Sequence, residues 1–132
     1  MTKIENQMRI CSFYIKGHNL KPNTIEEVLG VRAHKGFQRG EKRQTHSGSE
    51  VEYKNGLYCI RSQDNKNADF IRTVVDLVHQ HREKISEINE IEEMYFDIIE
   101  SCDDNDGRSV QIERDVVAMI ASIGAEIRFT CL

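Results

Sequence analysis

The order in which strand-like and helix-like segments alternate along the chain constrains its fold most. Hydrophobic side chains recur every second residue in some segments and every third or fourth in others, which are the periods of β-strands and amphipathic helices. The chain reads strand, helix, strand, strand, helix, strand, and then one more helix and strand. The expected strands are residues 8–16, 31–34, 57–62, 92–100 and 125–132, and the expected helices are residues 22–29, 68–84 and 112–123.

This order is typical of the split β-α-β arrangement of ferredoxin-like domains. We expect an α+β sandwich, in which helices cover one face of an antiparallel or mixed sheet, with residues 112–132 as a C-terminal helix-strand extension. The chain has 132 residues, of which 39% are hydrophobic, and this is enough for one core but not for two. We therefore predict a single α+β domain over residues 1–132.

Turn-forming residues mark the ends of two helices. Pro22 suits the first turn of the first helix. Asn23 is an alternative N-cap, with Glu26 completing a capping box. Gly30 and Gly124 are placed to end the first and the last helix in the left-handed conformation.

Residues 35–55 show no regular hydrophobic period. They are rich in charge and glycine and contain few large apolar side chains. A loop of this length inside a compact domain is uncommon, and it is either functional or mobile.

Residues 92–100 are apolar on both faces of the expected strand, which indicates a second apolar face of the sheet. A surface of this kind is rarely left bare. Either the last helix or the long loop covers it, or it contacts a partner or a second copy of the chain. The residues expected to share this face are Tyr14, Tyr58, Ile60, Tyr95 and Ile99.

The four cysteines indicate buried, reduced thiols. Cys11, Cys59 and Cys131 lie on apolar strand faces, where a thiol behaves as a small hydrophobic side chain, and Cys102 lies in a turn. Strand 125–132 is expected to point Ile127, Phe129 and Cys131 inward. The sequence has no C-x-x-C pair, which argues against a zinc site or a redox motif.

Charge is distributed unevenly, although the net charge is only −4. Residues 87–106 are strongly acidic and contain no lysine or arginine, whereas residues 32–43 are basic apart from Glu41. Such poles steer oppositely charged partners. The expected acidic partner face consists of Asp103, Asp104 and Asp106.

The basic stretch is the best candidate for a binding site. Its glycines let a ligand approach the backbone, and its arginines can each hold a carboxylate or phosphate through two hydrogen bonds. A merely solvated loop is the alternative. The candidate binding residues are Arg32, His34, Lys35, Arg39, Lys42, Arg43 and His46.

Signals for metal binding, catalysis or nucleic-acid binding are weak. Residues 102–113 match a calcium loop only in part, because Cys102 stands at the first ligand position. His79 and His81 lie two residues apart on an expected helix, which does not bring them together. The sequence has no nucleophile motif, and we expect no metal, no cofactor and no catalytic residue. Nucleic acid is not the expected partner, because Phe37 is the only aromatic residue of the basic stretch.

No segment has the length of a membrane span or the pattern of a signal peptide. Residues 1–7 have no apolar run, and the longest unbroken apolar run, residues 116–121, is far too short to cross a bilayer. We expect a soluble, cytoplasmic protein with no membrane partner.

Several short segments resemble a known protein family. They read F-Y-I-K-G (13–17), N-L-K-P (19–22), I-E-E-V-L-G-V (25–31), K-G (35–36), G-L-Y (56–58) and I-G-A-E-I (123–127). Together they make the chain similar to the bacterial family catalogued as domain of unknown function 4279. The resemblance implies a small α+β domain without an agreed activity, and it carries over no catalytic residue. It also implies a size similar to that of the small, often acidic immunity proteins of bacterial toxin systems.

We therefore expect a non-enzymatic protein-binding module, of the immunity-like kind, with a protein partner. The alternative is a domain that binds or processes a small ligand or a phosphate ester with the basic loop 32–46. A third hypothesis is a homodimer formed through the second sheet face.

Overall fold

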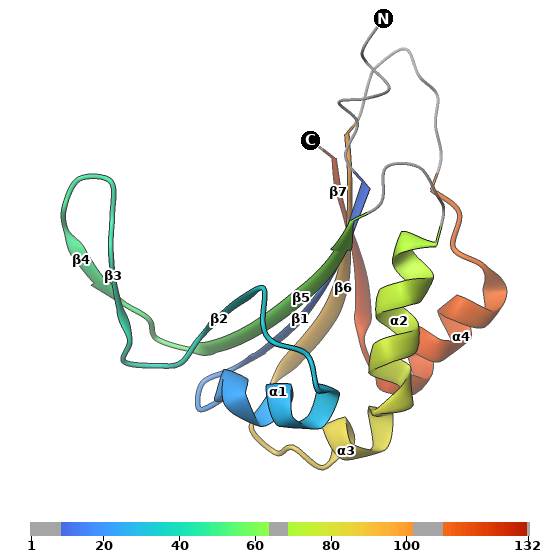
Figure 1. Ribbon diagram of the computed structural model, residues 1–132, viewed down its shortest axis with the longest axis horizontal. Helices are drawn as coiled ribbons and strands as arrows, with labels where there is room; N and C mark the ends of the chain where they lie inside the picture. The colour runs from blue at the N-terminus through green and yellow to red at the C-terminus, as the bar shows by residue number, and fades with distance from the viewer. Residues whose placement is uncertain (1–8, 64–68, 102–109, 132) are drawn as a thin grey trace, which may run out of the picture.

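The computed structural model describes residues 9–63, 69–101 and 110–131. Within these ranges a curved sheet carries helices on one side, and a two-stranded hairpin projects from its end (Figure 1). The strands are β1 (Arg9–Gly17), β2 (Lys35–Phe37), β3 (Lys42–Gln44), β4 (Glu50–Glu52), β5 (Gly56–Gln63), β6 (Glu93–Glu100) and β7 (Glu126–Cys131). The helices are α1 (Pro22–Leu29), α2 (Phe70–Gln80), α3 (Arg82–Ser86) and α4 (Arg114–Ile123).

The main sheet is mixed and has the strand order β2-β5-β1-β6-β7. The central strand β1 pairs antiparallel with β5 and with β6. On the outside, β2 is antiparallel to β5, and β7 is parallel to β6. The α+β class and the mixed sheet are confirmed, while the assignment to the ferredoxin-like class stays a prediction.

The core lies between the sheet and the helices. Phe13 on β1 and Phe96 on β6 are fully buried, and their ring centroids are 4.7 Å apart. Helix α2 covers them with Val75 and Val78, which are also fully buried. Burying a side chain of this size contributes about 1.5–3 kcal/mol, so these contacts hold α2 on the sheet.

Strand register places two of the five residues expected on the second face in the core instead. Tyr58 lies opposite Ile15, and Ile60 lies opposite Phe13, so both face the helices. The expectation was wrong for Tyr58 and Ile60, because a shift of one residue in register turns a side chain to the other face. The other three expected residues do lie on the side without helices.

The helix ends follow their turn residues. Helix α1 begins at Pro22 and ends at Gly30, whose φ is 71°. Gly124 ends α4 in the same way, with a φ of 84°. The N-cap of α1 is Lys21 rather than Asn23. In the ranges described above, none of the helices is long and apolar enough to cross a membrane.

The single helix expected over residues 68–84 is two helices. Helix α2 stops at Gln80, and His81, with a φ of −112°, separates it from α3. The break turns α3 so that Ile85 reaches the core, where it is 1% exposed. Periodicity alone does not reveal this break, because the apolar spacing continues through it.

The strand expected over residues 31–34 was wrong, and the second strand lies later, at β2. Residues 31–34 are held by single hydrogen bonds instead of a strand ladder. The Tyr58 hydroxyl donates to the Val31 carbonyl at 2.7 Å, and the His34 amide donates to the Cys59 carbonyl at 2.8 Å. The chain thereby follows the outside of β5 and enters β2 at Lys35, four residues later than expected.

Residues 35–55 contain the three short strands β2, β3 and β4, so the expectation of an irregular loop was wrong. After β2, residues 38–55 form a hairpin arm built from β3 and β4. Backbone hydrogen bonds between Gly40 and Tyr53, and between Tyr53 and Glu41, extend its ladder at 2.9 Å. The turn at the tip uses Gly48, whose φ is 86°. The arm has no hydrophobic period because both of its faces are largely exposed to solvent.

Two expectations for the cysteines and for β7 need correction. Cys11 and Cys59 are free and buried, as expected. Cys131 is exposed and disulfide-bonded, so it is neither reduced nor directed into the core as expected. Phe129 does not point into the core but is 62% exposed, because β7 is the last strand of the sheet.

Candidate functional site

The side of the sheet without helices combines aromatic rings with basic side chains. Tyr14 on β1 lies directly between Cys59 on β5 and Tyr95 on β6. The rings of Tyr14 and Tyr95 are stacked, with centroids 4.9 Å apart. Lys16 Nζ lies 5.2 Å and Arg128 Cζ 3.7 Å from the centre of the Tyr95 ring. Cations over aromatic rings are held by the negative ring face. Arg128 is also paired with Glu93 and Glu126, so the unpaired positive charge of this surface lies on the side of Lys16.

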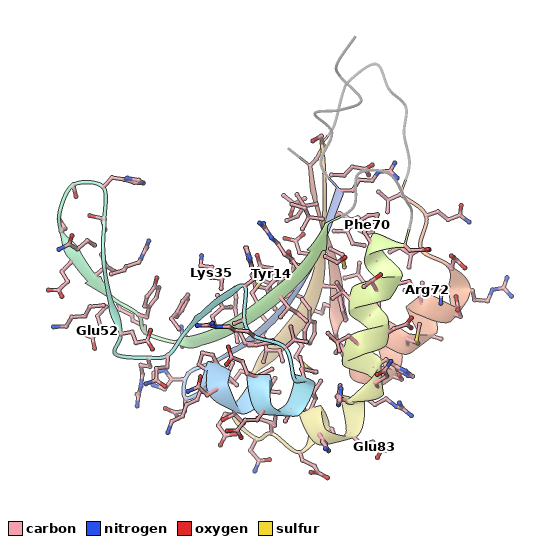
Figure 2. All side chains as sticks on the ribbon, in the orientation of Figure 1. Tyr14, Lys35, Glu52, Phe70, Arg72 and Glu83 are labelled. Carbon is pink, nitrogen blue, oxygen red and sulfur yellow. The ribbon has the colours of Figure 1, made fainter. Side chains whose placement is uncertain are left out.

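Strand β2 extends this surface toward the arm. Lys35 lies opposite Cys59, and Phe37 lies opposite Leu57. Figure 2 shows Tyr14 and Lys35 near each other, on the side of the sheet away from the labelled residues of α2. The Phe37 ring stacks on Tyr53 at the base of the arm, with centroids 3.6 Å apart. This stack positions the arm beside the sheet.

A cavity of about 400 Å³ opens where the sheet meets the arm. Three of its lining side chains are lysines, three are aromatic, and none is acidic. We call it the lysine cavity. It is lined by Tyr14, Lys16, Lys35, Phe37, Tyr53, Lys54, Asn55, Gly56 and Leu57. Three ammonium groups around one hollow create a positive potential that attracts anions.

The hydroxyl of Tyr14 and the thiol of Cys59 at this surface are protonated near pH 7. Burial, and then the nearby Cys59, raise the pKa of Tyr14 to about 12. Burial also raises the pKa of Cys59 above its usual value, even though Tyr14, Arg61 and Lys35 lower it. Because the thiolate is the reactive form, a protonated, buried Cys59 is not a nucleophile. The protonated Tyr14 hydroxyl forms a side-chain hydrogen bond with Cys59.

The structure distributes the residues of the predicted basic site over several places. Lys35 lines the lysine cavity. Arg32 and His34 line a second cavity of about 400 Å³ beside α1, which also contains Glu26 and Glu41. With two carboxylates beside its cations, this second cavity has no strong charge preference.

The other predicted basic residues belong to the arm. Arg39 Nη1 donates a hydrogen bond to His18 Nε2 at 2.7 Å. Lys42 and Arg43 lie on the exposed strand β3, with Arg43 Cζ 5.6 Å from the centre of the Tyr53 ring. His46 is exposed in the turn at the tip of the arm. The seven residues therefore do not form one clamp.

Sequence reasoning did not assign Lys16, Lys54 or Tyr53 to a binding site, and it placed Tyr14 on the second sheet face without connecting it to the basic site. Lys16 comes from the end of β1, and Lys54 lies at the base of the arm, almost forty residues later in the chain. Only the pairing of β1 with β5 and the return of the arm bring the two together. A cluster of aromatic and basic residues at both ends of the 35–55 segment was the available signal.

The predicted acidic face, Asp103, Asp104 and Asp106, lies outside the described residues. So does most of the partial calcium motif, but Glu113 at its end is described. Glu113 Oε2 contacts Arg72 Nη2 at 3.0 Å, which shows a structural role for its carboxylate. Among the described residues, no group of three or more His, Cys, Asp or Glu side chains could hold a metal ion.

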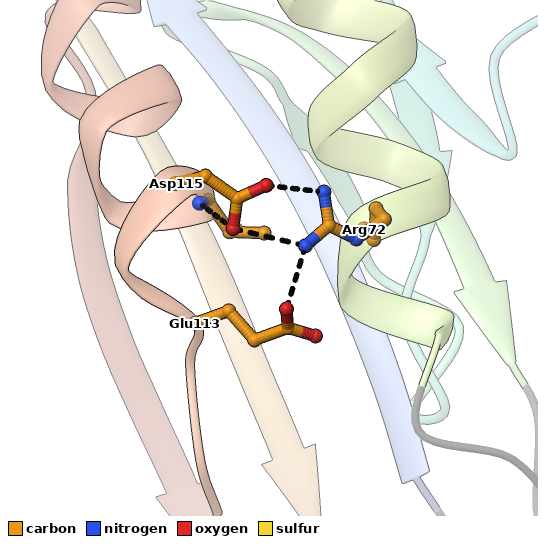
Figure 3. Close-up of polar contacts among 4 residues, drawn as sticks. Arg72, Glu113 and Asp115 are labelled. Atoms are coloured by element: carbon orange, nitrogen blue, oxygen red, sulfur yellow. Dashed lines mark hydrogen bonds and ion pairs between the residues drawn. The ribbon is translucent and has the colours of Figure 1, made fainter.

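Arg72, Glu113 and Asp115 form a cluster of charged side chains, called here the Arg72 cluster, that connects helices α2 and α4 (Figure 3). The Arg72 guanidinium on α2 donates to both carboxylate oxygens of Asp115 on α4, at 2.8 and 3.0 Å. Asp115 also accepts from the Val116 amide at 3.0 Å, and these bonds, led by that from Arg72, lower its pKa. The charges are paired with one another, so this cluster is a support for the fold and not a free binding site.

The comparisons with known proteins identify a family but no activity. The model of the family described as domain of unknown function 4279 matches residues 6–132, so the chain belongs to that family. No curated protein and no solved structure matches the chain. The family resemblance found in the sequence is thereby confirmed. The function of the chain has to be inferred from the geometry of the site.

Proposed function

We propose that this member of the family is a non-enzymatic binding module that recognises an acidic segment of a partner protein. The observation that supports this most is the lysine cavity, in which Lys16, Lys35 and Lys54 surround a hollow without any acidic lining residue. Ammonium groups form charge-assisted hydrogen bonds with carboxylates, which are the strongest ordinary hydrogen bonds of proteins. A segment rich in Asp and Glu therefore suits this surface.

The aromatic residues suit a protein partner as well. Tyr14, Phe37 and Tyr53 offer flat aromatic contact area, which is amphipathic at the two tyrosines, with little side-chain entropy to lose on binding. A stable protein interface buries about 800 Å² on each side, which is more than one cavity offers. The partner is therefore expected to extend from the cavity along the arm, where Lys42 and Arg43 are exposed.

A binding role without catalysis agrees with the chemistry of the surface. Its one thiol, Cys59, is buried with a raised pKa, and the hydroxyl of Tyr14 stays protonated near pH 7. Neither is a nucleophile in that state. The immunity-like role is a narrower form of the same proposal, in which the acidic partner is a toxin.

Charge reversal within the lysine cavity tests the proposal. The protein is immobilised and used to capture proteins from a lysate of its native host, beside the variants Lys35→Glu and Lys54→Glu. The matched control is Lys84→Glu, which makes the same charge change on an exposed residue of α3, away from the cavity. We expect one stoichiometric protein with the wild type and the control, and its loss with both cavity variants.

The identity of the recognised segment is then measured directly. A synthetic peptide with the most acidic segment of the captured protein should compete, and its affinity should fall steeply as salt is raised, because exposed charges are screened. Capture that is equally strong with Lys35→Glu, Lys54→Glu and Lys84→Glu would refute recognition at the lysine cavity. An RNA oligonucleotide that binds with the same dependence on Lys35 and Lys54 would refute a protein partner.

A second candidate function is the binding of a small anionic ligand in the same cavity. Its volume of about 400 Å³ lies within the range of roughly 300–1,000 Å³ that is usual for ligand pockets. Titration calorimetry with inorganic phosphate and with nucleoside monophosphates tests it. Saturable binding that Lys35→Glu abolishes, together with empty captures, would favour the small ligand over the protein partner.

We also propose the ferredoxin-like class for residues 9–100. Support comes from β5, which lies between β2 and β1 as the split β-α-β unit requires. On this proposal β7 and α4 are the C-terminal extension. An experimental structure in which another strand enters the sheet between β1 and β6 would contradict it.

A further inference from the structure

The outer edge of β7 is a sheet edge that the described part of the chain does not cover. Strand β7 is the last in the order β2-β5-β1-β6-β7, and no described strand lies beyond it. Glu126, Phe129 and Thr130 on β7 are exposed. An uncovered edge presents backbone N–H and C=O groups that can pair with another strand. The opposite edge differs, because β2 has only three residues.

The side chains of β7 do little to protect this edge. Proteins commonly guard an edge with proline, with a bulge or with an outward lysine. The one cation of β7, Arg128, points back over the sheet instead, where its guanidinium lies 3.7 Å from the Tyr95 ring centre and contacts Glu93. Phe129, which is 62% exposed, is the most exposed large hydrophobic side chain among the described residues.

We propose that two copies of the chain pair antiparallel along β7, with a two-fold axis through Ile127. In this arrangement the two sheets become one continuous sheet. Glu126 of each copy lies opposite Arg128 of the other, on the face without helices. Phe129 of each copy lies opposite the small side chain of Ala125 on the helix face, which leaves room for the ring.

The charges of β7 select this register over its neighbours. A slide of two residues in one direction places Glu126 opposite Glu126, and a slide of two in the other places Arg128 opposite Arg128. Like charges directly opposite each other are destabilising. A slide of one residue would place helix-face side chains opposite those of the other face. In the proposed register, Glu126 of each copy lies opposite Arg128 of the other copy. The dimer therefore has two pairs of opposite charges, one at each symmetry-related position.

Existing contacts leave Glu126 able to accept a second arginine. Within one copy, Arg128 contacts both Glu93 and Glu126, so two carboxylates share one cation. The contact with Glu126 is long, at 3.6 Å, and the Glu126 side chain is 69% exposed. Arg128 of a second copy would give Glu126 a second cationic neighbour. The inference does not depend on the proposed function, because no residue of β7 lines the lysine cavity.

Complementary charge variants test the interface. The molar masses of the wild type, Glu126→Arg and Arg128→Glu are measured by sedimentation equilibrium, each alone and the two variants mixed in equal amounts. We expect a dimer for the wild type, and a dissociation constant raised about tenfold or more for each variant, since each change acts at two places. The mixture should form a heterodimer, because the Glu126→Arg copy then faces the Arg128→Glu copy with opposite charges at both positions.

A second pair of variants keeps the test decisive if Arg128→Glu does not fold. Phe129→Glu should be monomeric with an unchanged circular dichroism spectrum, because the ring is exposed in one copy. Val117→Glu is its control, since Val117 on α4 is 44% exposed and lies outside β7, so it should remain dimeric. A monomeric wild type at the highest soluble concentration would overturn the proposal. Dimers that persist in Glu126→Arg and Phe129→Glu would overturn it as well.

Discussion

Phe37 on β2 and Tyr53 at the base of the hairpin arm stack with their ring centroids 3.6 Å apart. Among the described residues, this is the aromatic contact that connects the arm to the main sheet. Both rings also line the lysine cavity. The cavity therefore exists only while the arm is held in place.

Replacing Tyr53 should release the arm without unfolding the domain. Tyr53→Ala removes the stack, but the core residues lie on the opposite face of the sheet. We expect limited proteolysis to cut residues 38–55 several times faster than in the wild type, with a thermal midpoint changed by only a few degrees. Tyr53→Phe keeps the ring and should behave as the wild type. Equal cleavage of Tyr53→Ala and Tyr53→Phe would show that the stack does not hold the arm.

Gly56 should tolerate no side chain. It lies opposite Gly17 at the end of the β1–β5 ladder, and a Cβ added to it would lie 1.9 Å from the Leu20 carbonyl oxygen. Because the obstacle is backbone, Gly56→Ala should cost about 3 kcal/mol of unfolding free energy in urea denaturation. The comparison is Gly48→Ala at the arm tip, where a Cβ meets nothing within 4 Å and only the positive φ of 86° opposes it. Gly48→Ala should cost roughly 1–2 kcal/mol of unfolding free energy. A larger cost for Gly48→Ala than for Gly56→Ala would contradict the close approach at Gly56.

Cys11 should make the domain sensitive to alkali. Burial raises its pKa from 9.0 to about 12. Between these two pH values the Cys11 thiol is protonated in the folded state but ionised in the unfolded chain. The folded state then binds more protons, and its stability falls as the pH rises from about 9 to 12, by up to about 1.4 kcal/mol per pH unit. Cys11→Val lacks this titration, so the stability difference between the two proteins should change across this window. Parallel curves in urea denaturation from pH 8 to 10.5 would exclude the effect.

The pair of Arg72 and Asp115 should contribute modest, salt-dependent stability. Both side chains are partly or largely exposed, and such pairs are screened by salt. Since Arg72 lowers the pKa of Asp115, the contribution is present above the unfolded pKa of an aspartate and is lost as the pH falls through the folded one. Arg72→Gln should therefore lower the thermal midpoint slightly at neutral pH and low salt.

The same variant supplies its own control. At 1 M salt, or at a pH below the folded pKa of Asp115, the midpoints of the wild type and Arg72→Gln should converge. A difference that stays constant under all these conditions would mean that Arg72 acts through packing of its aliphatic part on α2 and α4, not through its charge.

The sequence predicted most elements because their signals are local. Pro22, Gly30 and Gly124 mark helix ends through their own backbone preferences, and the stretch around Phe13 has the period of a strand by itself. The break at His81 was not predictable in this way, since the apolar spacing continues from α2 into Ile85. The arm escaped prediction because its strands bury almost nothing, and hydrophobic period is the signal on which the prediction depends.

The sequence by itself determined the α+β class, the family and the uneven distribution of charge, since these follow from local periodicity and from the order of residues. Only the tertiary structure decided which side chains meet. Pairing of β1 with β5 turned Tyr58 into the core and brought Lys16 beside Lys54, two residues far apart in the chain. The physical reason is that strand register and the return of the arm depend on contacts between distant segments, and one residue of register exchanges the two faces of a strand.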